Sequence, residues 1–406
     1  MLGAACPFVP AQRNRHSRLS DLVHAEALLP RQPESDLTML TLSVGFLVSF
    51  LVTTWVVRYA HLHGKFSADK EFDGAQKFHT RAVPRIGGVG IAIALAVQSL
   101  VLYLEHAKYA AEFALLAVAA VPAFGAGLLE DLTKQVSPRT RLIATVLAAL
   151  LAVWLLDARV IRLDIPTIDH WLVFLPLSIA LTAIAVAGTA NAVNIIDGFN
   201  GLAVMVVANM FMSIAYVATQ VNDWLVLSVA ITMVGAMFGF FAWNFPAGLV
   251  FLGDGGAYLI GFVLAEAAVM LVMRNPKVSA WYPVLMLIYP IFETLFSIYR
   301  KRMLRGISPG IPDGVHLHML IYKRLMRWAV GSRDERQRLR RNSLTAPYLW
   351  ILSLLAVLPA SIFWANGMVL CVFVALFVLT YVWLYWRIVR FKVPKWMIIR
   401  KSKKSS

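Results

Sequence analysis

Long uninterrupted apolar runs dominate the chain, and polar residues gather in the short segments between them. Most of these runs hold roughly 18 to 22 residues, which is the length of helix that crosses about 30 Å of hydrocarbon. The pattern predicts an all-α, polytopic integral membrane protein with about 11 transmembrane helices. The predicted spans are 38–58, 86–104, 110–129, 142–156, 171–190, 202–219, 224–243, 257–273, 281–299, 348–365 and 367–386.

The composition also favours a membrane protein over a soluble one. Hydrophobic residues make up 59% of the 406 residues, and charged residues only 15%. Soluble domains carry about 25% charged residues, so we expect much of the apolar surface to face lipid. The two cysteines, Cys6 and Cys371, are too few for a disulfide framework or a zinc cluster.

The net charge of +16 is spread unevenly over the loops. Most Lys and Arg residues lie in the C-terminal tail and in the loops that join the first span to the second, the third to the fourth and the ninth to the tenth. By the positive-inside rule, these segments are cytoplasmic and the N-terminus lies outside. Basic runs beside membrane spans commonly face anionic lipid headgroups, so we expect the lipid bilayer and no nucleic acid as a partner.

The chain divides into three expected segments. Residues 1–37 are polar, contain several prolines and lack the apolar core of a signal peptide, so we expect a disordered N-terminal tail. Residues 38–390 form the transmembrane domain, and residues 391–406 form a basic cytoplasmic tail. Met39 opens the first span, which leaves open whether Met1 or Met39 is the natural start.

Carboxylates stand at the predicted cytoplasmic ends of two spans. Glu130 and Asp131 end the third span, although a helix C-terminus and nearby hydrocarbon both disfavour negative charge. A cation or a proton must therefore compensate them, unless they form a hydrated pair at the interface. Asp254 lies between two glycines at the start of the eighth span. A helix cap is one interpretation, and the neighbouring acids favour a metal ligand.

The stretch "NIIDGFNGLA", residues 194–203, joins the fifth and sixth spans. Asn191, Asn194 and Asp197 recur at three-residue spacing and therefore share one face of a helical turn. Their amide and carboxylate oxygens are the hard ligands that Mg²⁺ accepts. A polar cap and turn is the alternative interpretation.

Basic side chains collect at the same predicted face. Lys77 and Thr80 precede the second span, where phosphate binding competes with an ordinary positive-inside flank. His316 and His318 do not share a helix face, so a helical zinc pair is not expected. Together with Arg324, these imidazoles favour binding of a diphosphate over a basic solvated loop.

Glu293 is a lone acid inside the apolar run of the ninth span. An acid within a membrane span is rare and is normally paired or functional. We therefore expect Glu293 to pair with a basic residue at the cytoplasmic edge.

Taken together, these motifs resemble the polyprenyl-phosphate N-acetylhexosamine-1-phosphate transferases, the WecA/MraY superfamily, over about residues 40 to 390. About eleven spans and the His-x-His form of the last motif resemble the WecA branch more than the MraY branch, whose loop carries a run of histidines. The matching segments, in chain order, are "KFHTRAVPRIGG", "EDLTK", "NAVNIIDGFNGLA", "FLGDGGAYLIGF", "FETLFSIYRKR" and "PDGVHLHMLIYKR".

The resemblance implies a Mg²⁺-dependent reaction, with Mn²⁺ as a candidate substitute. A polyprenyl phosphate attacks the β-phosphorus of a UDP-N-acetylhexosamine and gives polyprenyl-diphospho-sugar and UMP. The matching positions imply metal ligands, catalytic residues and substrate-binding residues in one transmembrane phosphoglycosyltransferase domain. The implied metal ligands are Asp254, Asn194 and Asp197; the catalytic residues are Glu130, Asp131, Asp197 and Lys77; the substrate-binding residues are Asn191, Thr80, His316, His318 and Arg324.

The resemblance further implies a multi-pass protein of the bacterial inner membrane with its active site on the cytoplasmic face. The expected substrates are UDP-N-acetylglucosamine, or a related amino sugar, and undecaprenyl phosphate. The product would enter a cell-envelope glycan such as the O-antigen of lipopolysaccharide. A homodimer is compatible with this assignment.

Four positions depart from the family pattern. Glu130 and Glu293 stand where an Asp is usual, and Met319 replaces a second consecutive His. Asn200 stands where many members carry Asp, so we assign it no metal ligand role and expect Asn200→Asp to be tolerated. These departures bear on the identity of the sugar more than on the class of reaction.

Three alternatives remain at this point. One is an MraY-type phospho-N-acetylmuramoyl-pentapeptide transferase, and another is a structural protein of an envelope complex. The third is a secondary transporter, which would need polar groups near the bilayer midplane rather than at one face.

Overall fold

The computed structural model describes residues 32–61, 68–69, 83–304, 306, 314–326 and 335–390. Most of the expected N-terminal tail, the whole tail at 391–406, and the predicted site residues Lys77 and Thr80 lie outside these ranges. Two units are distinguished, Met1–Leu40 and Thr41–Ser406. The described part of the first unit is the start of α2, and the architecture below is that of the second unit.

The described chain is almost entirely helical, as the apolar pattern predicts. Its only described strands, β1 (Ala68–Asp69) and β2 (Val83–Pro84), form a short antiparallel pair. Two π-helical segments, η1 (Arg300–Leu304) and η2 (Ile321–Met326), follow α14 and α15. The α-helices are α2 (Gln32–Arg58), α4 (Gly88–Leu104), α5 (Ala110–Ala119), α6 (Val121–Thr133), α7 (Pro138–Leu156), α8 (Pro166–Leu172), α9 (Leu175–Ile196), α10 (Leu202–Val221), α11 (Trp224–Asn244), α12 (Gly253–Arg274), α13 (Trp281–Met286), α14 (Ile288–Tyr299), α15 (Leu317–Leu320), α17 (Glu335–Ile362) and α18 (Gly367–Val389).

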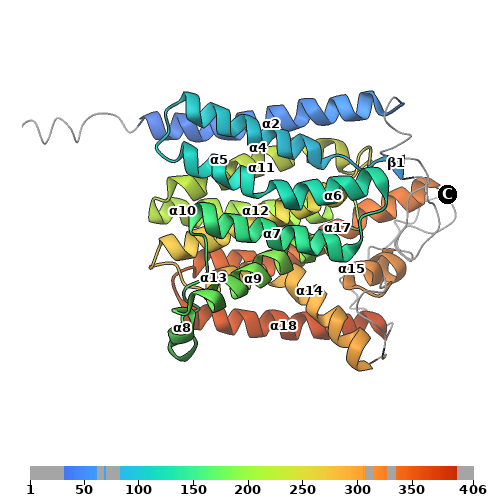
Figure 1. The fold of residues 1–406 in the computed structure, drawn as a ribbon. Coiled ribbons are helices and arrows are strands. Elements are labelled where there is room, and N and C mark those ends of the chain that lie inside the picture. Colours follow the sequence, from blue (N-terminus) through green and yellow to red (C-terminus); the bar gives the residue numbers. More distant parts are fainter. Residues whose placement is uncertain are drawn as a thin grey trace, which may run out of the picture. The chain divides into compact units, whose positions relative to one another are not determined.

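Each predicted span corresponds to one helix or to a pair of consecutive helices. Among the described residues, 9 helices are long and apolar enough to cross a membrane, and α4 is a shorter apolar helix of 17 residues. The ninth predicted span is divided at Leu287 into α13 and α14. Pro290 explains the division, because proline cannot donate the backbone hydrogen bond that would carry one helix into the next. Figure 1 shows α14 running obliquely to α18.

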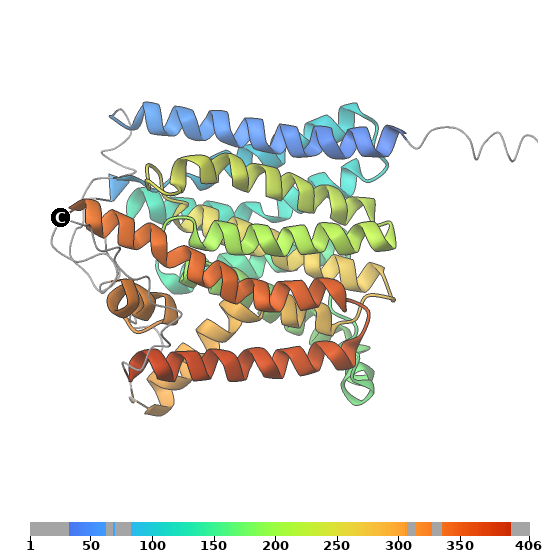
Figure 2. The ribbon, with the colours of Figure 1, turned by 180° about the vertical axis from the view of Figure 1, so that it is seen from behind.

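Helix α12 lies at the centre of the packing and contacts α4, α6, α7, α9, α10 and α11. Figures 1 and 2 show it among these neighbours from opposite sides. Of its most apolar window, 94% is buried, against 22% for α18. Gly127 of α6 lies directly against this helix, since a Cβ atom there would lie 2.6 Å from the Cα atom of Gly255. Small residues therefore let α6 approach the start of α12, where Asp254 lies.

Candidate active site

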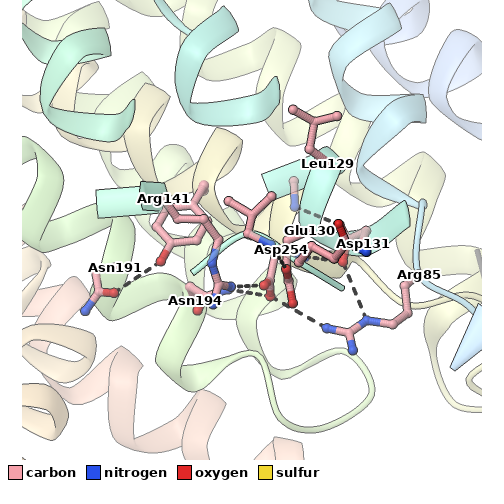
Figure 3. Close-up of polar contacts among 12 residues, drawn as sticks. Arg85, Leu129, Glu130, Asp131, Arg141, Asn191, Asn194 and Asp254 are labelled. Carbon is pink, nitrogen blue, oxygen red and sulfur yellow. Dashed lines mark hydrogen bonds and ion pairs between the residues drawn. The ribbon is translucent and has the colours of Figure 1, made fainter. Parts of the chain in front are cut away.

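Asp254 is the centre of a cluster of charged and polar side chains at the N-terminus of α12 (Figure 3). Gly253 immediately precedes it with φ of +75°, and a Cβ atom there would lie 1.8 Å from the carbonyl oxygen of Arg85. Only glycine fits this turn. The helix dipole favours an acid in the first turn. The turn therefore fixes where the Asp254 carboxylate can lie.

Three side chains from three other segments converge on the Asp254 carboxylate (Figure 3). The Asn194 amide nitrogen, from α9, donates to Asp254 Oδ1 at 3.0 Å. Arg141, from the first turn of α7, forms an ion pair with Asp254 Oδ2. Arg85, from the segment before α4, places its guanidinium 3.7 Å from Asp254 Oδ1. Two cations thus neutralise this acid.

Asp131 reaches the same place from the end of α6, and its side chain is only 1% exposed. Its two carboxylate oxygens accept the backbone N–H groups of Asp254 and Gly255, both at 2.9 Å. Arg85 Nε lies 3.5 Å from Asp131 Oδ1. Asp131 therefore caps the N-terminus of α12 and shares one arginine with Asp254.

Glu130 makes a different contact from its neighbour Asp131. Its Oε2 atom accepts the backbone N–H of Val136 at 2.8 Å and so stabilises the turn after α6. Consecutive residues on a helix point about 100° apart, which separates the two acids. The structure thus bonds Asp131 to α12 and Glu130 to the turn after α6.

Asn191 and Asp197 complete the contribution of α9. Asn191 Oδ1 accepts the hydroxyl of Tyr258 at 3.3 Å, and Asp197 is the residue at which α9 ends. Burial raises the pKa of the Asp197 carboxyl from 3.8 to about 7, although Arg85 opposes the rise and Asp131 adds to it. The Asp197 carboxyl is therefore coupled electrostatically to Arg85 and Asp131 of the cluster.

Arg85 and Arg141 also lie in the cluster, although the sequence pattern gives neither of them a specific role. Arg141 lies in the first turn of α7, and Ser137 caps the N-terminus of that helix. The guanidinium of Arg141 lies 5.9 Å from the centre of the Tyr258 ring. Both arginines belong to the basic flanks that the positive-inside rule already explains. Their type and position therefore carry no separate signal in the sequence.

His318 lies beside the turn that follows α9, and the His316 ring is stacked on it. A Cβ atom on Gly198 would lie 3.7 Å from His318 Nε2, and the His318 and Phe199 rings meet edge to face at 5.8 Å. His316 Nδ1 lies 3.1 Å from Glu293 Oε1. The expectation that Glu293 pairs with a basic residue is therefore confirmed, with a histidine as the partner.

The side chain of Arg324, in η2, meets the C-terminus of α18. Its guanidinium donates to the carbonyl oxygens of Ile388, at 2.9 Å, and of Val389. A cation at this position stabilises the last turn of a helix. The structure therefore gives Arg324 a capping contact, and its part in substrate binding stays a prediction.

Asn200 ties the turn after α9 to other segments. Its backbone N–H donates to Asn342 Oδ1 of α17 at 2.8 Å, and its amide nitrogen donates to the carbonyl oxygen of Pro246 at 3.2 Å. The residue is 2% exposed. Asn200 therefore links the turn after α9 to α17 and to Pro246, and its exclusion from the metal ligands stays a prediction.

The chemistry of the cluster fits a magnesium ion. Asp254, Asp197 and Asn194 offer carboxylate and amide oxygens, the ligand type that Mg²⁺ prefers. The guanidinium groups of Arg85 and Arg141 lie beside Asp254 as alternative counter-ions. A divalent cation at the carboxylates would release them for anionic ligands.

The part of the chain that carries this cluster matches a known protein family. A sequence model of "Glycosyl transferase family 4" matches residues 113–272, which contain Asp131, Asp197 and Asp254. A "Probable undecaprenyl-phosphate N-acetylglucosaminyl 1-phosphate transferase" of Bacillus subtilis is 27% identical over 73% of this chain and 81% of its own length. An "Undecaprenyl-phosphate alpha-N-acetylglucosaminyl 1-phosphate transferase" of Thermotoga maritima is 30% identical over 63% of this chain and 73% of its own length.

A third relative carries a different activity in its name. This "Phospho-N-acetylmuramoyl-pentapeptide-transferase" of Caldicellulosiruptor bescii is 28% identical over 70% of this chain and 89% of its own length. The matches cover most of the length of each relative. The names of the relatives include both N-acetylglucosaminyl 1-phosphate transferases and a phospho-N-acetylmuramoyl-pentapeptide-transferase. The chain belongs to glycosyl transferase family 4, the WecA/MraY superfamily, and is an enzyme of the sugar-1-phosphate transferase class.

Proposed function

We propose that this enzyme transfers N-acetylglucosamine 1-phosphate from UDP-N-acetylglucosamine to undecaprenyl phosphate and releases UMP. The reaction would take place at the cytoplasmic face of a bacterial inner membrane, as the first membrane step of a cell-envelope glycan. The Bacillus subtilis and Thermotoga maritima relatives support the choice of sugar and lipid. The asymmetry of Lys and Arg among the loops supports the orientation.

The observation that carries the proposal is the convergence of acids and arginines from four segments on the start of α12. Asp131 and Asp254 are joined through the backbone of α12, and Arg85 lies within 3.7 Å of both carboxylates. Transfer of a phosphoryl group to another phosphate brings two anions together. Its catalysis therefore depends mainly on neutralising charge and on aligning the reactants.

We assign the metal to Asp254, Asp197 and Asn194, on the donor chemistry of their side chains. Bound there, Mg²⁺ would polarise the diphosphate and stabilise the leaving UMP. Asp131 would hold Asp254 in place through its two bonds to the α12 backbone. Arg85 and Arg141, displaced from the carboxylates, would meet phosphate oxygens.

The remaining site residues are assigned by their positions in the family motifs. Glu130 or Asp131 would receive the proton of the lipid phosphate, and Lys77 and Thr80 would meet phosphate oxygens. The nucleotide-sugar would be bound by residues of α9 and of the segment after η1. These are Asn191, His316, His318 and Arg324.

The position of the cluster suits one soluble and one lipid substrate. Asp131 lies near the end of the candidate span Ala110–Thr133, which α5 and α6 form together. Asp197 directly follows the span Leu175–Ile196, and Asp254 lies at the beginning of the span Gly253–Arg274. A polyprenyl phosphate keeps its chain in hydrocarbon and its phosphate at the interface. A site at helix ends can therefore receive this lipid from the side and the nucleotide-sugar from water.

The test is the release of UMP by detergent-purified protein given undecaprenyl phosphate and a panel of UDP-sugars. We expect release with UDP-N-acetylglucosamine that requires Mg²⁺ and is partly restored by Mn²⁺. Release only with UDP-N-acetylmuramoyl-pentapeptide would favour the activity named for the Caldicellulosiruptor bescii relative. No release with any sugar, together with metal-independent solute flux in proteoliposomes, would refute the proposal.

A further inference from the structure

The Glu293 carboxylate holds the His-x-His segment through several hydrogen bonds. Glu293 lies in α14 and is 1% exposed. Its Oε1 atom lies 3.1 Å from His316 Nδ1 and accepts the backbone N–H of Leu317 at 2.8 Å. Its Oε2 atom accepts the hydroxyl of Tyr381, in α18, at 2.8 Å. One buried carboxylate therefore joins α14, α18 and the start of α15.

A second contact from α18 holds the same segment. The Tyr385 hydroxyl donates to the carbonyl oxygen of Val315 at 3.3 Å. The Arg300 guanidinium lies over the Tyr385 ring, 5.1 Å from its centre. The segment before α15 is therefore fixed by α14 and α18, and Lys323 of η2 adds a hydrogen bond to the carbonyl oxygen of Gly314 at 2.9 Å.

The two imidazole rings are held in register by this arrangement. Their centres are 5.1 Å apart and their planes differ by 9°. The Nδ1 atoms of His316 and His318 lie 3.1 Å and 3.8 Å from the same Glu293 oxygen. With Nδ1 toward Glu293, the Nε2 edges point the other way. For His318 that edge lies beside Gly198, next to Asp197.

A metal ion is the obvious alternative for Glu293, His316 and His318, since their ligand atoms lie within 4.8 Å of one another. The existing hydrogen bonds disfavour it. The carboxylate already accepts donors from Leu317 and Tyr381, and His316 Nδ1 lies 3.1 Å from the same Oε1 atom that Leu317 uses. The cluster is better described as a carboxylate that orients His316, on which His318 is stacked, as acids commonly do for functional imidazoles.

We infer that Glu293 is a positioning residue for the nucleotide-sugar: it holds His316 Nδ1 directly and His318 through the stacked rings, so that the Nε2 edges of both histidines face the diphosphate beside the Asp197 turn. This inference rests on the proposed function. Glu293 touches neither substrate, and its effect reaches the substrate only through the histidines. The lipid phosphate, bound by other residues, should not depend on it.

The experiment compares Glu293→Gln, Glu293→Asp and Tyr381→Phe in the UMP-release assay, with KM measured separately for each substrate. Gln removes the charge and one acceptor, so we expect KM for the UDP-sugar to rise about tenfold, the effect of losing one charge-assisted hydrogen bond. Asp keeps the carboxylate and should recover most of this loss. Tyr381→Phe leaves the carboxylate and should raise the same KM by about threefold. In all three variants, KM for undecaprenyl phosphate should change less than twofold.

Two matched controls separate positioning from general damage. Glu266, in α12, is another fully buried acid, and its carboxylate has no hydrogen-bond partner among the described residues. Tyr282 carries a buried hydroxyl bonded to Ser213. Glu266→Gln and Tyr282→Phe should leave both KM values unchanged, and melting temperatures show which variants are folded.

The outcomes separate this inference from the proposed function. Combining Glu293→Gln with His318→Ala should add little to the effect of His318→Ala alone, because both act on the same interaction. An active wild type whose Glu293→Gln variant keeps its KM for the UDP-sugar, or raises both KM values equally, overturns the inference alone. If Glu293→Gln does not fold, Tyr381→Phe decides by the same criterion. A wild type that releases no UMP with any sugar removes the proposed function and this inference with it.

Discussion

Replacing Asp131 tests whether this acid holds Asp254 in place. Asp131 accepts two buried backbone N–H groups at the start of α12, each at 2.9 Å. Hydrogen bonds to a charged group contribute about 1.5 to 3 kcal/mol each. Asp131→Ala should therefore lower the free energy of unfolding by about 3 kcal/mol or more. Asp131→Asn keeps one acceptor oxygen and should lose about half as much.

The assay is thermal unfolding of the purified protein with and without Mg²⁺. A ligand that binds only the folded state raises its stability with the logarithm of its concentration over its Kd. If the loss of the cap shifts Asp254 and weakens Mg²⁺ about tenfold, the stabilisation by saturating Mg²⁺ falls by about 1.4 kcal/mol. Turnover should fall together with it.

The matched control is Asp223→Asn. Asp223 caps α11 in the same way, since its side chain accepts the backbone N–H of Val226 at 3.2 Å, and it pairs with Arg274. This variant should lower the melting temperature and leave the Mg²⁺ shift intact. An Asp131→Asn protein with normal melting temperature and normal Mg²⁺ shift, but without turnover, would refute the capping argument and favour a direct chemical role.

Three further changes give separate tests. Asp254→Asn removes the acid on which Asn194 and two arginines converge. We expect this variant to stay folded but to lose both turnover and the Mg²⁺-induced rise in melting temperature. Near-normal turnover would contradict this. For Asp197, the folded carboxyl with a pKa of about 7 keeps a proton that the unfolded chain loses above 3.8. The free energy of unfolding without Mg²⁺ should therefore fall as pH rises from 3.8 to about 7, and the affinity for Mg²⁺ should rise over the same range. In thermal-shift titrations, Asp197→Asn should flatten the pH dependence of both the stability and the Mg²⁺ affinity. The sequence predicts that Asn200→Asp is tolerated, but an ionised aspartate cannot donate a hydrogen bond to the carbonyl oxygen of Pro246. We therefore expect this variant to lower the free energy of unfolding by about 1 to 3 kcal/mol. A wild-type melting temperature would contradict this.

Most of the fold could be predicted because span length and hydropathy depend on the bilayer rather than on tertiary contacts. The division of the ninth span at Leu287 could have been anticipated from Pro290, but proline does not by itself say whether a membrane helix bends or ends.

The acids of the site were recognisable because a carboxylate at the edge of a span needs compensation. The groups that compensate these carboxylates could not be predicted from the sequence. Asp131 bonds to the backbone of residues more than 120 positions away, and Arg141 meets Asp254 across 113 positions. Such contacts depend on how α6, α7 and α12 pack against one another. The sequence does not distinguish a basic residue at the membrane edge that pairs with an acid from one that faces water or lipid headgroups.

Anomalous X-ray diffraction from crystals soaked with Mn²⁺ tests the central claim most directly, because it locates the metal. The account predicts one peak between the carboxylates of Asp254 and Asp197, at the start of α12. A peak at Glu293, His316 and His318 instead, or no peak within reach of Asp254 in crystals of active protein, would contradict it.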